Sequence, residues 1–252
     1  MSKTTIVLLS LIVGLTALST SAFAVAFSAP GTSNIFAAGG SLATAGDGTG
    51  TAPTFISFAA GGGTLTFSGV TGTVNCGPFC AGESSGPTNN GPDGAAYNGM
   101  GPGATNISAS NGISGISFSG REMFLVGVFL DSSVPSVAPA GLVYNAGFAD
   151  NSTSFSPLIG QLFDIGNGLT GGPLDAPGVA QTYNIPVGAT RLFFGFADAL
   201  GFTGAPGMYN DDTPGAITGT VNLAVNPTPE PGTLVLMGLG FCGLALLRRK
   251  VA

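Results

Sequence analysis

Histidine and tryptophan are absent from the sequence, and charged residues are few. Of 252 residues, 12 are acidic and 6 are basic. Because histidine is the commonest general base and metal ligand in proteins, its absence excludes most hydrolase mechanisms and histidine-based zinc sites. No lysine lies between residues 25 and 226 to activate a serine, and no spacing among the acidic residues identifies the acid and nucleophile of a glycosidase. We therefore expect that the protein is not an enzyme.

Long helices are disfavoured as well. The chain contains 43 glycines and 17 prolines, and inside a helix each glycine costs about 1 kcal/mol and each proline about 3 kcal/mol relative to alanine. At the same time 44% of the residues are hydrophobic, which is enough to bury a core and disfavours a disordered chain. The composition predicts strands joined by turns.

The acidic residues are concentrated in the middle of the chain. Between residues 25 and 226, Arg121 and Arg191 are the only basic residues, against eleven acidic ones. A nucleic acid partner is excluded, because affinity for phosphates depends on a basic surface. Cations are the more compatible ligands.

The first 24 residues have the features of a secretory signal peptide. Lys3 supplies a positive charge, residues 6–18 are mostly apolar, and Ala22-Phe23-Ala24 is an A-x-A cleavage site. We expect a signal helix that signal peptidase removes by cutting after Ala24. The alternative is an N-terminal membrane anchor, but the apolar run has 13 residues, whereas a bilayer needs about 20.

The last 26 residues, 227–252, form a second apolar segment with polar ends. Pro229-Glu230-Pro231 precedes an apolar run over residues 233–247, and Arg248-Arg249-Lys250 follows it. As a single hydrophobic helix this run would measure about 22 Å, which is short for a hydrocarbon core of about 30 Å. The basic residues should stay on the cytoplasmic side of the membrane, so the preceding chain should lie outside.

This order of motifs resembles the PEP-CTERM sorting signal of exported bacterial proteins, carried by Pro229-Glu230-Pro231, the apolar run and Arg248-Arg249-Lys250. The resemblance implies an exosortase-type transpeptidase that reads Glu230, cuts near it and moves the protein from a membrane-anchored precursor to the cell surface or the extracellular space. A permanent single-span anchor is the alternative. The same type of tail is also known under an ice-binding name, which suggests ice binding as a third possible function. The sequence shows no regular array of threonines that would support it.

Residues 25–226 have the length of one all-β domain. Residues 64–68 alternate between apolar and polar, and residues 123–130 are continuously apolar, as in a central strand buried on both faces. We expect an antiparallel β-sandwich with a long loop over residues 82–111, either a ligand loop or a flexible one. The expected strands are 54–59, 64–74, 113–119, 122–130, 141–148, 161–165, 181–187, 190–197 and 216–225.

Three cysteines are present. Cys76 and Cys80 enclose Gly77-Pro78-Phe79, and in an oxidising exported compartment we expect them to form a disulfide rather than a metal site. Cys242 lies in the apolar tail and should act as a small hydrophobe.

The densest group of polar residues predicts a calcium site. Asp198 follows a strong strand, and Asn210, Asp211 and Asp212 lie together in a glycine- and proline-rich segment. Carboxylates, amides and backbone carbonyls are the ligands that calcium prefers. The alternative is a turn whose side chains bond to local N–H groups.

Residues 191–198 and 206–215 resemble PEP-CTERM proteins and, through them, small calcium-dependent galactose-binding lectins. Asp198 and Tyr209 match that lectin pattern, and Asp211 and Asp212 replace its paired asparagines. The resemblance implies a jelly-roll, lectin-like fold and an extracellular polysaccharide as partner. The chain departs from the pattern at Met208, where a calcium-binding threonine would lie, and its carbohydrate-binding positions are not assigned.

Two further groups were interpreted from their neighbours. Arg191 precedes three phenylalanines, Phe193, Phe194 and Phe196, which we assign to the core rather than to a sugar platform. Arg121 and Glu122 are interpreted as a surface ion pair. The sequence therefore predicts a surface or extracellular-matrix protein with a lectin-like domain, or a purely structural protein without a specific ligand.

Overall fold

Alternating apolar and small polar residues build most of the structure. The computed structural model describes residues 21–42, 50–60, 62–75, 89–96, 104–119, 121–144, 151–171, 178–197, 203–204, 206, 215–225, 238 and 240. Residues 21–225 form one unit, and strands dominate its described part. The all-β prediction is confirmed. Residues 1–20 of the predicted signal helix, and the C-terminal helix except for Gly238 and Gly240, lie outside the described residues, whereas residues 21–24 of that predicted helix are in a strand.

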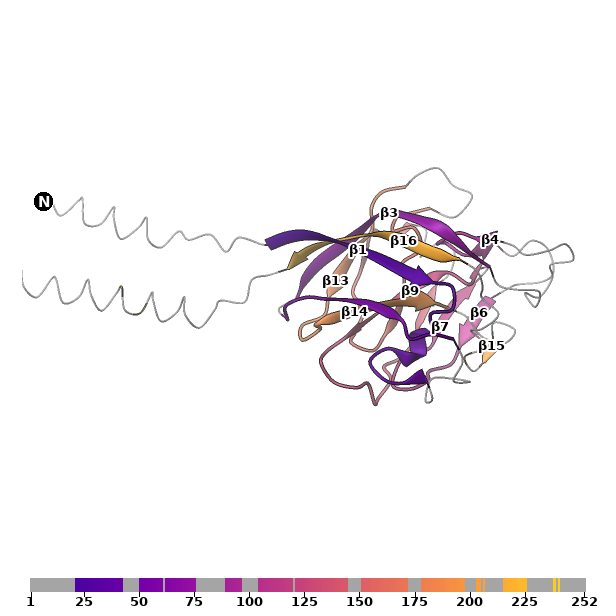
Figure 1. The fold of residues 1–252 in the computed structure, drawn as a ribbon, viewed down its shortest axis with the longest axis horizontal. Coiled ribbons are helices and arrows are strands. Elements are labelled where there is room, and N and C mark those ends of the chain that lie inside the picture. The colour runs from indigo at the N-terminus through magenta and orange to yellow at the C-terminus, as the bar shows by residue number, and fades with distance from the viewer. Residues whose placement is uncertain are drawn as a thin grey trace, which may run out of the picture. The chain divides into compact units, whose positions relative to one another are not determined.

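The largest sheet contains the first and last strands of the domain, which lie side by side in Figure 1. Phe67, Val221 and Leu223 point into the core, whereas their polar neighbours along the strands point outward. The strands run in the order β1 (Ser21–Pro30), β16 (Ala216–Val225), β3 (Gly63–Asn75), β13 (Thr182–Ile185) and β11 (Ser154–Phe155), with β4 (Asn89–Asn90) paired to β3.

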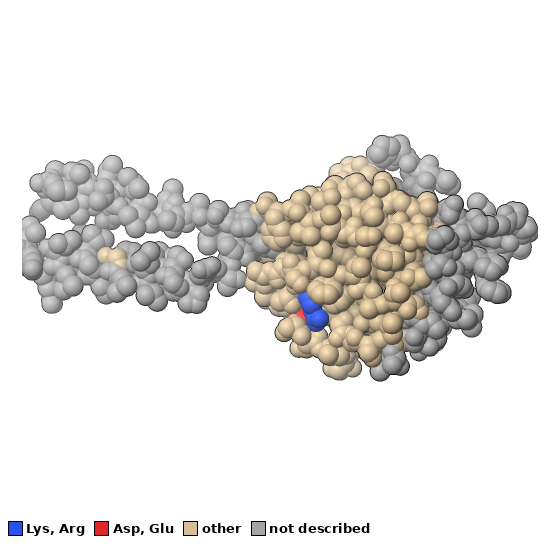
Figure 2. All heavy atoms as spheres, in the orientation of Figure 1, with Lys and Arg blue, Asp and Glu red and all other residues tan. Residues whose placement is uncertain are grey.

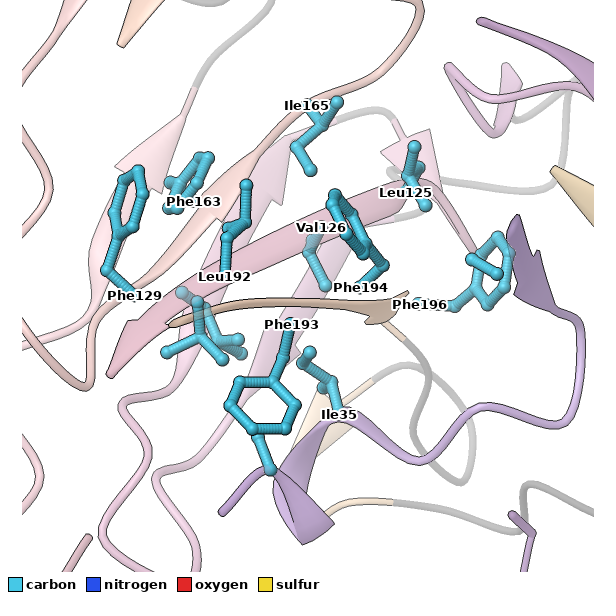
Figure 3. Packing of buried hydrophobic residues seen from close by; sticks show 14 of the residues in the cluster. Ile35, Leu125, Val126, Phe129, Phe163, Ile165, Leu192, Phe193, Phe194 and Phe196 are labelled. Carbon is cyan, nitrogen blue, oxygen red and sulfur yellow. The ribbon is translucent and has the colours of Figure 1, made fainter. Parts of the chain in front are cut away.

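Except along one edge strand, a second, four-stranded sheet is buried on both faces. It runs in the order β12 (Leu162–Asp164), β9 (Leu125–Leu130), β14 (Arg191–Phe196) and β2 (Thr54–Ser57). Every residue of β9 is buried, which confirms the prediction of a central strand. Figure 3 shows Leu192 and Phe194 on one side of β14 and Phe193 on the other, where Ile35 of the 3-10 helix η1 (Ile35–Ala37) lies.

Aromatic side chains hold these two sheets together. Phe194 of β14 stacks on Phe27 of β1 with ring centroids 4.4 Å apart, and its ring lies edge-on to Phe67 of β3. Phe163 of β12 contacts Tyr183 of β13 at 5.3 Å. The core therefore lies between the two sheets, as expected for two packed layers.

A third sheet is mixed. Its strands run in the order β10 (Leu142–Tyr144), β7 (Ile116–Ser119), β6 (Ala104–Ile107) and β15 (Thr203–Gly204), and the short strands β5 (Ala95–Ala96) and β8 (Arg121–Glu122) pair beside it. The pairs β10–β7, β15–β6 and β11–β13 are parallel. The prediction of a purely antiparallel fold is wrong for these pairs, because each joins segments distant in sequence that no tight turn connects.

Most predicted strands are present, with shifted ends. The prediction for 216–225 coincides with β16, and that for 122–130 is split by Met123, whose φ of 51° separates β8 from β9. The expected loop over residues 82–111 instead contains β4, β5 and β6, and Thr105 and Ile107 of β6 are buried. Strand β1 was not predicted, because its first four residues were assigned to the signal peptide.

The interpretation of Arg121 as a surface residue is wrong. Its side chain is 6% exposed, and its guanidinium carbon lies 4.9 Å from the centre of the Phe118 ring. Strand β8 pairs with β5, and the carbonyl of Arg121 accepts from Thr105 Oγ1 of β6 at 2.8 Å, so β8 is held against the third sheet. Packing on an aromatic ring is a common environment for a guanidinium group, which is less strongly hydrated than an ammonium.

None of the described residues forms a helix long and apolar enough to cross a membrane.

Candidate functional site

The predicted binding residues lie mostly outside the part of the chain that the structure describes. This holds for the cation ligands Asp198, Asn210, Asp211 and Asp212, for the predicted disulfide Cys76–Cys80, and for the sorting residues Pro229, Glu230, Pro231, Arg248, Arg249 and Lys250. Among the described ranges, no three Asp, Glu or Cys side chains gather in a way that could hold a metal ion. The calcium site and the disulfide remain predictions.

The structure does fix both flanks of the predicted calcium segment. Ala197, directly before Asp198, is buried, and its N–H donates to the carbonyl of Phe124 at 3.1 Å. At the other flank, the carbonyl of Gly215 accepts from the N–H of Gly31 at 3.0 Å. The segment between them therefore starts and ends on the ordered sheets.

A buried polar cluster joins three strands within the domain. The N–H of Asp164 on β12 donates to the hydroxyl of Tyr144 on β10 at 3.3 Å, and the hydroxyl of Tyr183 on β13 donates to Gln181 Oε1 at 3.1 Å. Asp93 is also buried, and its Oδ1 accepts from the N–H of Asn167 at 2.8 Å. The cluster connects the third sheet to the other two.

Burial controls the protonation of these tyrosines. It raises the pKa of Tyr144 and of Tyr183 well above the ordinary value of 10.0, and the negative charge of Asp164 raises both further. Both hydroxyls therefore stay neutral at physiological pH and serve as hydrogen-bonding groups. Their position beneath the surface makes them structural contacts between strands.

The aromatic residues of β14 belong to the core, which confirms that prediction. Phe193 is 5% exposed, and Phe194 and Phe196 are fully buried. Beside them, Phe55 on the edge strand β2 is 53% exposed and packs on Phe193 with centroids 4.8 Å apart. No sequence signal distinguishes Phe55, because its exposure depends on β2 lying at the end of its sheet.

Arg191 is the first residue of β14 in the second sheet. Its Nε donates to the carbonyl of Asp131 at 2.8 Å, its Nη2 donates to that carbonyl and to the carbonyl of Ser133, and its guanidinium carbon lies 5.3 Å from the centre of the Phe193 ring. These contacts hold the loop after β9 against β14. Arg191 is thus bound to backbone carbonyls of its own domain.

The outer face of the largest sheet carries uncharged hydroxyl and amide groups. We call this surface the hydroxyl face; its exposed or half-buried residues are Thr64, Thr66, Ser68, Thr71, Thr73, Thr182, Asn184, Thr218, Thr220 and Asn222. Asn222 Nδ2 donates to Ser68 Oγ at 2.9 Å across β16 and β3. On the side of the molecule drawn in Figure 2, the described surface carries one small group of charged side chains.

The threonines of the hydroxyl face are brought together by strand pairing, because they come from strands that are distant in the sequence. Neighbouring strands lie about 4.8 Å apart, and outward residues recur about every 7 Å along a strand. A bulge interrupts this pattern, because Gly69 and Val70 of β3 oppose the single residue Gly219 of β16. The face offers hydrogen-bonding groups without a continuous lattice.

The first and last strands of the domain end together. Ser21 pairs with Val225 and Pro30 pairs with Ala216, so β1 and β16 are antiparallel over their full length. The chain therefore enters and leaves the domain at the same end of the sheet. The apolar run of the predicted signal, residues 6–18, precedes Ser21 in the sequence, and Pro229-Glu230-Pro231 comes shortly after Val225.

Comparison with known proteins identifies the segment that follows β16. Neither the curated proteins nor the solved structures contain a significant match to this chain. Residues 227–250 match the PEP-CTERM protein-sorting motif, and this motif indicates an exported, membrane-anchored precursor that an exosortase-type enzyme processes. The chain thus carries the PEP-CTERM sorting motif of exported surface proteins at its C-terminal end.

Proposed function

We propose that the protein is a non-enzymatic surface or matrix protein, held at the cell surface through its C-terminal end, with the β-domain as its displayed part. The pairing of Ser21 with Val225 carries this proposal. During export the domain is connected to the membrane through the signal peptide and through the sorting segment. Both segments join the domain at the same end of the largest sheet. The opposite end is therefore available to face outward.

The dimensions of the strands support this arrangement. A strand rises about 3.4 Å per residue, so the ten residues of β16 place Ala216 about 30 Å from Val225. The predicted calcium segment leads into β16 at Ala216, at the end opposite the attachment. A ligand site there would be presented away from the membrane.

Processing is tested with Glu230→Ala in a host that contains the exosortase. We expect the variant to accumulate as an unprocessed, membrane-retained precursor, because the sorting motif loses its acidic residue. Glu83→Ala, which removes an acid outside the motif, serves as the control and should be processed like the wild type. Normal processing of the Glu230→Ala variant would contradict the role of this residue.

The finer proposal is that the domain binds calcium through Asp198, Asn210, Asp211 and Asp212, and carbohydrate with it. Calorimetric titration of calcium into the exported protein tests this directly. We expect heat in the wild type, loss of heat in Asp211→Ala/Asp212→Ala, and retention in the charge-matched control Asp150→Ala/Asp175→Ala. A site with a Kd 100-fold below the free calcium concentration would also stabilise the fold by about 2.7 kcal/mol.

A structural role without a specific ligand is the second candidate, favoured by the hydroxyl face. Its uncharged side chains offer many weak hydrogen bonds. If wild type gives no calcium heat, and a glycan array is negative with and without calcium, the structural role is the better description. A calcium-dependent signal on the array would instead support the lectin-like function.

A further inference from the structure

Strand β1 extends across the boundary predicted for the signal peptide. Its inward side chains are Phe23, Val25, Phe27 and Ala29, and the outward positions Ala22, Ala24, Ala26 and Ser28 are all exposed. Along the inward side, exposure falls from 38% at Phe23 to 7% at Phe27 and 0% at Ala29. Phe23 is thus still exposed, but the pairing with β16 continues through the bond after Ala24 as far as Ser21↔Val225, so residues 21–24 belong to a strand of the domain.

The partner strand depends on these residues as well. β16 pairs with β3 on one side up to Val225↔Gly63, and with β1 on the other side up to Ser21↔Val225. A cut after Ala24 would remove the four pairs that cover Asn222–Val225. Part of a central strand would become a sheet edge with unpaired backbone groups, and the core residue Leu223 would lose its cross-strand neighbour Phe23.

The sequence offers a cleavage site that leaves the strand intact. Ala17 and Ser19 are small residues at the third and first positions before the bond that follows Ser19. Within the apolar stretch of residues 6–18, the part from residue 6 to residue 15 lies before Ala17 and has ten residues, which is within the range of about 7–15 for a signal peptide. Cleavage here would place Thr20 at the start of the mature chain, directly before β1.

We propose that signal peptidase hydrolyses the Ser19–Thr20 bond, and that the exported protein keeps the whole of β1. One water molecule is consumed, leaving a carboxylate on Ser19 of the released leader and an amino group on Thr20 of the exported chain. This processing site is separate from the C-terminal sorting motif. The two proposals can therefore fail independently.

N-terminal sequencing of the exported full-length protein, supported by intact mass, tests the assignment. The expected first residue is Thr20. A chain that begins at Val25 overturns the proposal, because it lacks the first four residues of β1. A chain that begins at any other residue overturns the assignment of the Ser19–Thr20 bond.

Two variants separate the candidate bonds. Ser19→Leu places a large residue directly before the proposed bond and should abolish the form that begins at Thr20. Ala24→Leu makes the same change before the other candidate bond, at an exposed outward position that tolerates a larger side chain, and should leave both the yield and the Thr20 start unchanged. Loss of processing in Ala24→Leu, or an unchanged Thr20 start in Ser19→Leu, overturns the proposal.

Discussion

Phe194 should be among the most costly side chains to remove from this domain. It is fully buried between the two large sheets, stacked on Phe27 at 4.4 Å and edge-on to Phe67 at 6.5 Å. Truncating a buried phenylalanine to alanine costs about 3–5 kcal/mol, and each aromatic pair contributes about 0.5–1.5 kcal/mol beyond burial. We expect Phe194→Ala to lower the free energy of unfolding by about 4–5 kcal/mol, a large part of the roughly 5–15 kcal/mol of a typical domain.

Phe55→Ala provides the matched control. Phe55 contacts the same strand, β14, but is 53% exposed, so its truncation should cost about 1 kcal/mol. Urea unfolding of the exported protein, followed by circular dichroism, measures both variants. With a slope of about 2 kcal/mol per molar urea, the midpoint should fall by about 2 M for Phe194→Ala and by about 0.5 M for Phe55→Ala. Equal shifts for the two variants would refute the placement of the core between the sheets.

Three other properties follow from the structure. Burial raises the pKa of Tyr144 and Tyr183 above the value in the unfolded chain, so their contribution to the free energy of unfolding should be complete below pH 10. Above pH 10 the free energy of unfolding should fall by up to about 2.7 kcal/mol per pH unit for the pair. Tm measured from pH 8 to pH 11 should show this fall, and Tyr144→Phe should halve its slope. Gly72 has a φ of 119°, and a Cβ there would collide with the carbonyl oxygen of Ala216, so Gly72→Ala should lower the free energy of unfolding by at least about 2 kcal/mol. Gly69 has a φ of 59° and open space around it, so Gly69→Ala should lower it by about 1 kcal/mol. Similar unfolding midpoints for the two variants would contradict this geometry. The exported part contains eleven acidic and two basic residues, so moderate sodium chloride should raise Tm by screening the repulsion between the acidic residues. An unchanged Tm would show that this repulsion does not limit stability.

The strands that the sequence predicted best are those whose pattern is local. β16 and β3 alternate between apolar and hydroxyl residues, and β9 is apolar throughout. In each strand a few consecutive residues therefore indicate whether one face or both faces are buried. The sorting motif was found for the same reason, because its proline, acid, apolar and basic parts are adjacent in the chain. Such features need no knowledge of tertiary contacts.

The features that were missed depend on distant partners. Small and apolar residues at 21–24 suit both a cleavage site and a strand, and only the pairing with β16 distinguishes the two. Arg121 is next to an acid in the sequence, yet it is buried against Phe118. Phe55 is exposed although its strand neighbour Ile56 is buried, because β2 lies at the edge of its sheet. The parallel pair β15–β6 joins segments nearly a hundred residues apart.

The position of β16 also determines how the domain bears mechanical load. The sorting motif begins at residue 227, two positions after Val225, so a pull through a C-terminal attachment reaches the fold at the end of this strand. β16 is paired on both sides, with β1 and with β3. If the far end of the domain is held, such a pull shears both ladders at once and loads all their hydrogen bonds together. A pull that separates Ser21 from Val225 would instead peel β1 away one pair at a time. Attachment through the C-terminal end alone is therefore the geometry in which this sheet resists drag most strongly.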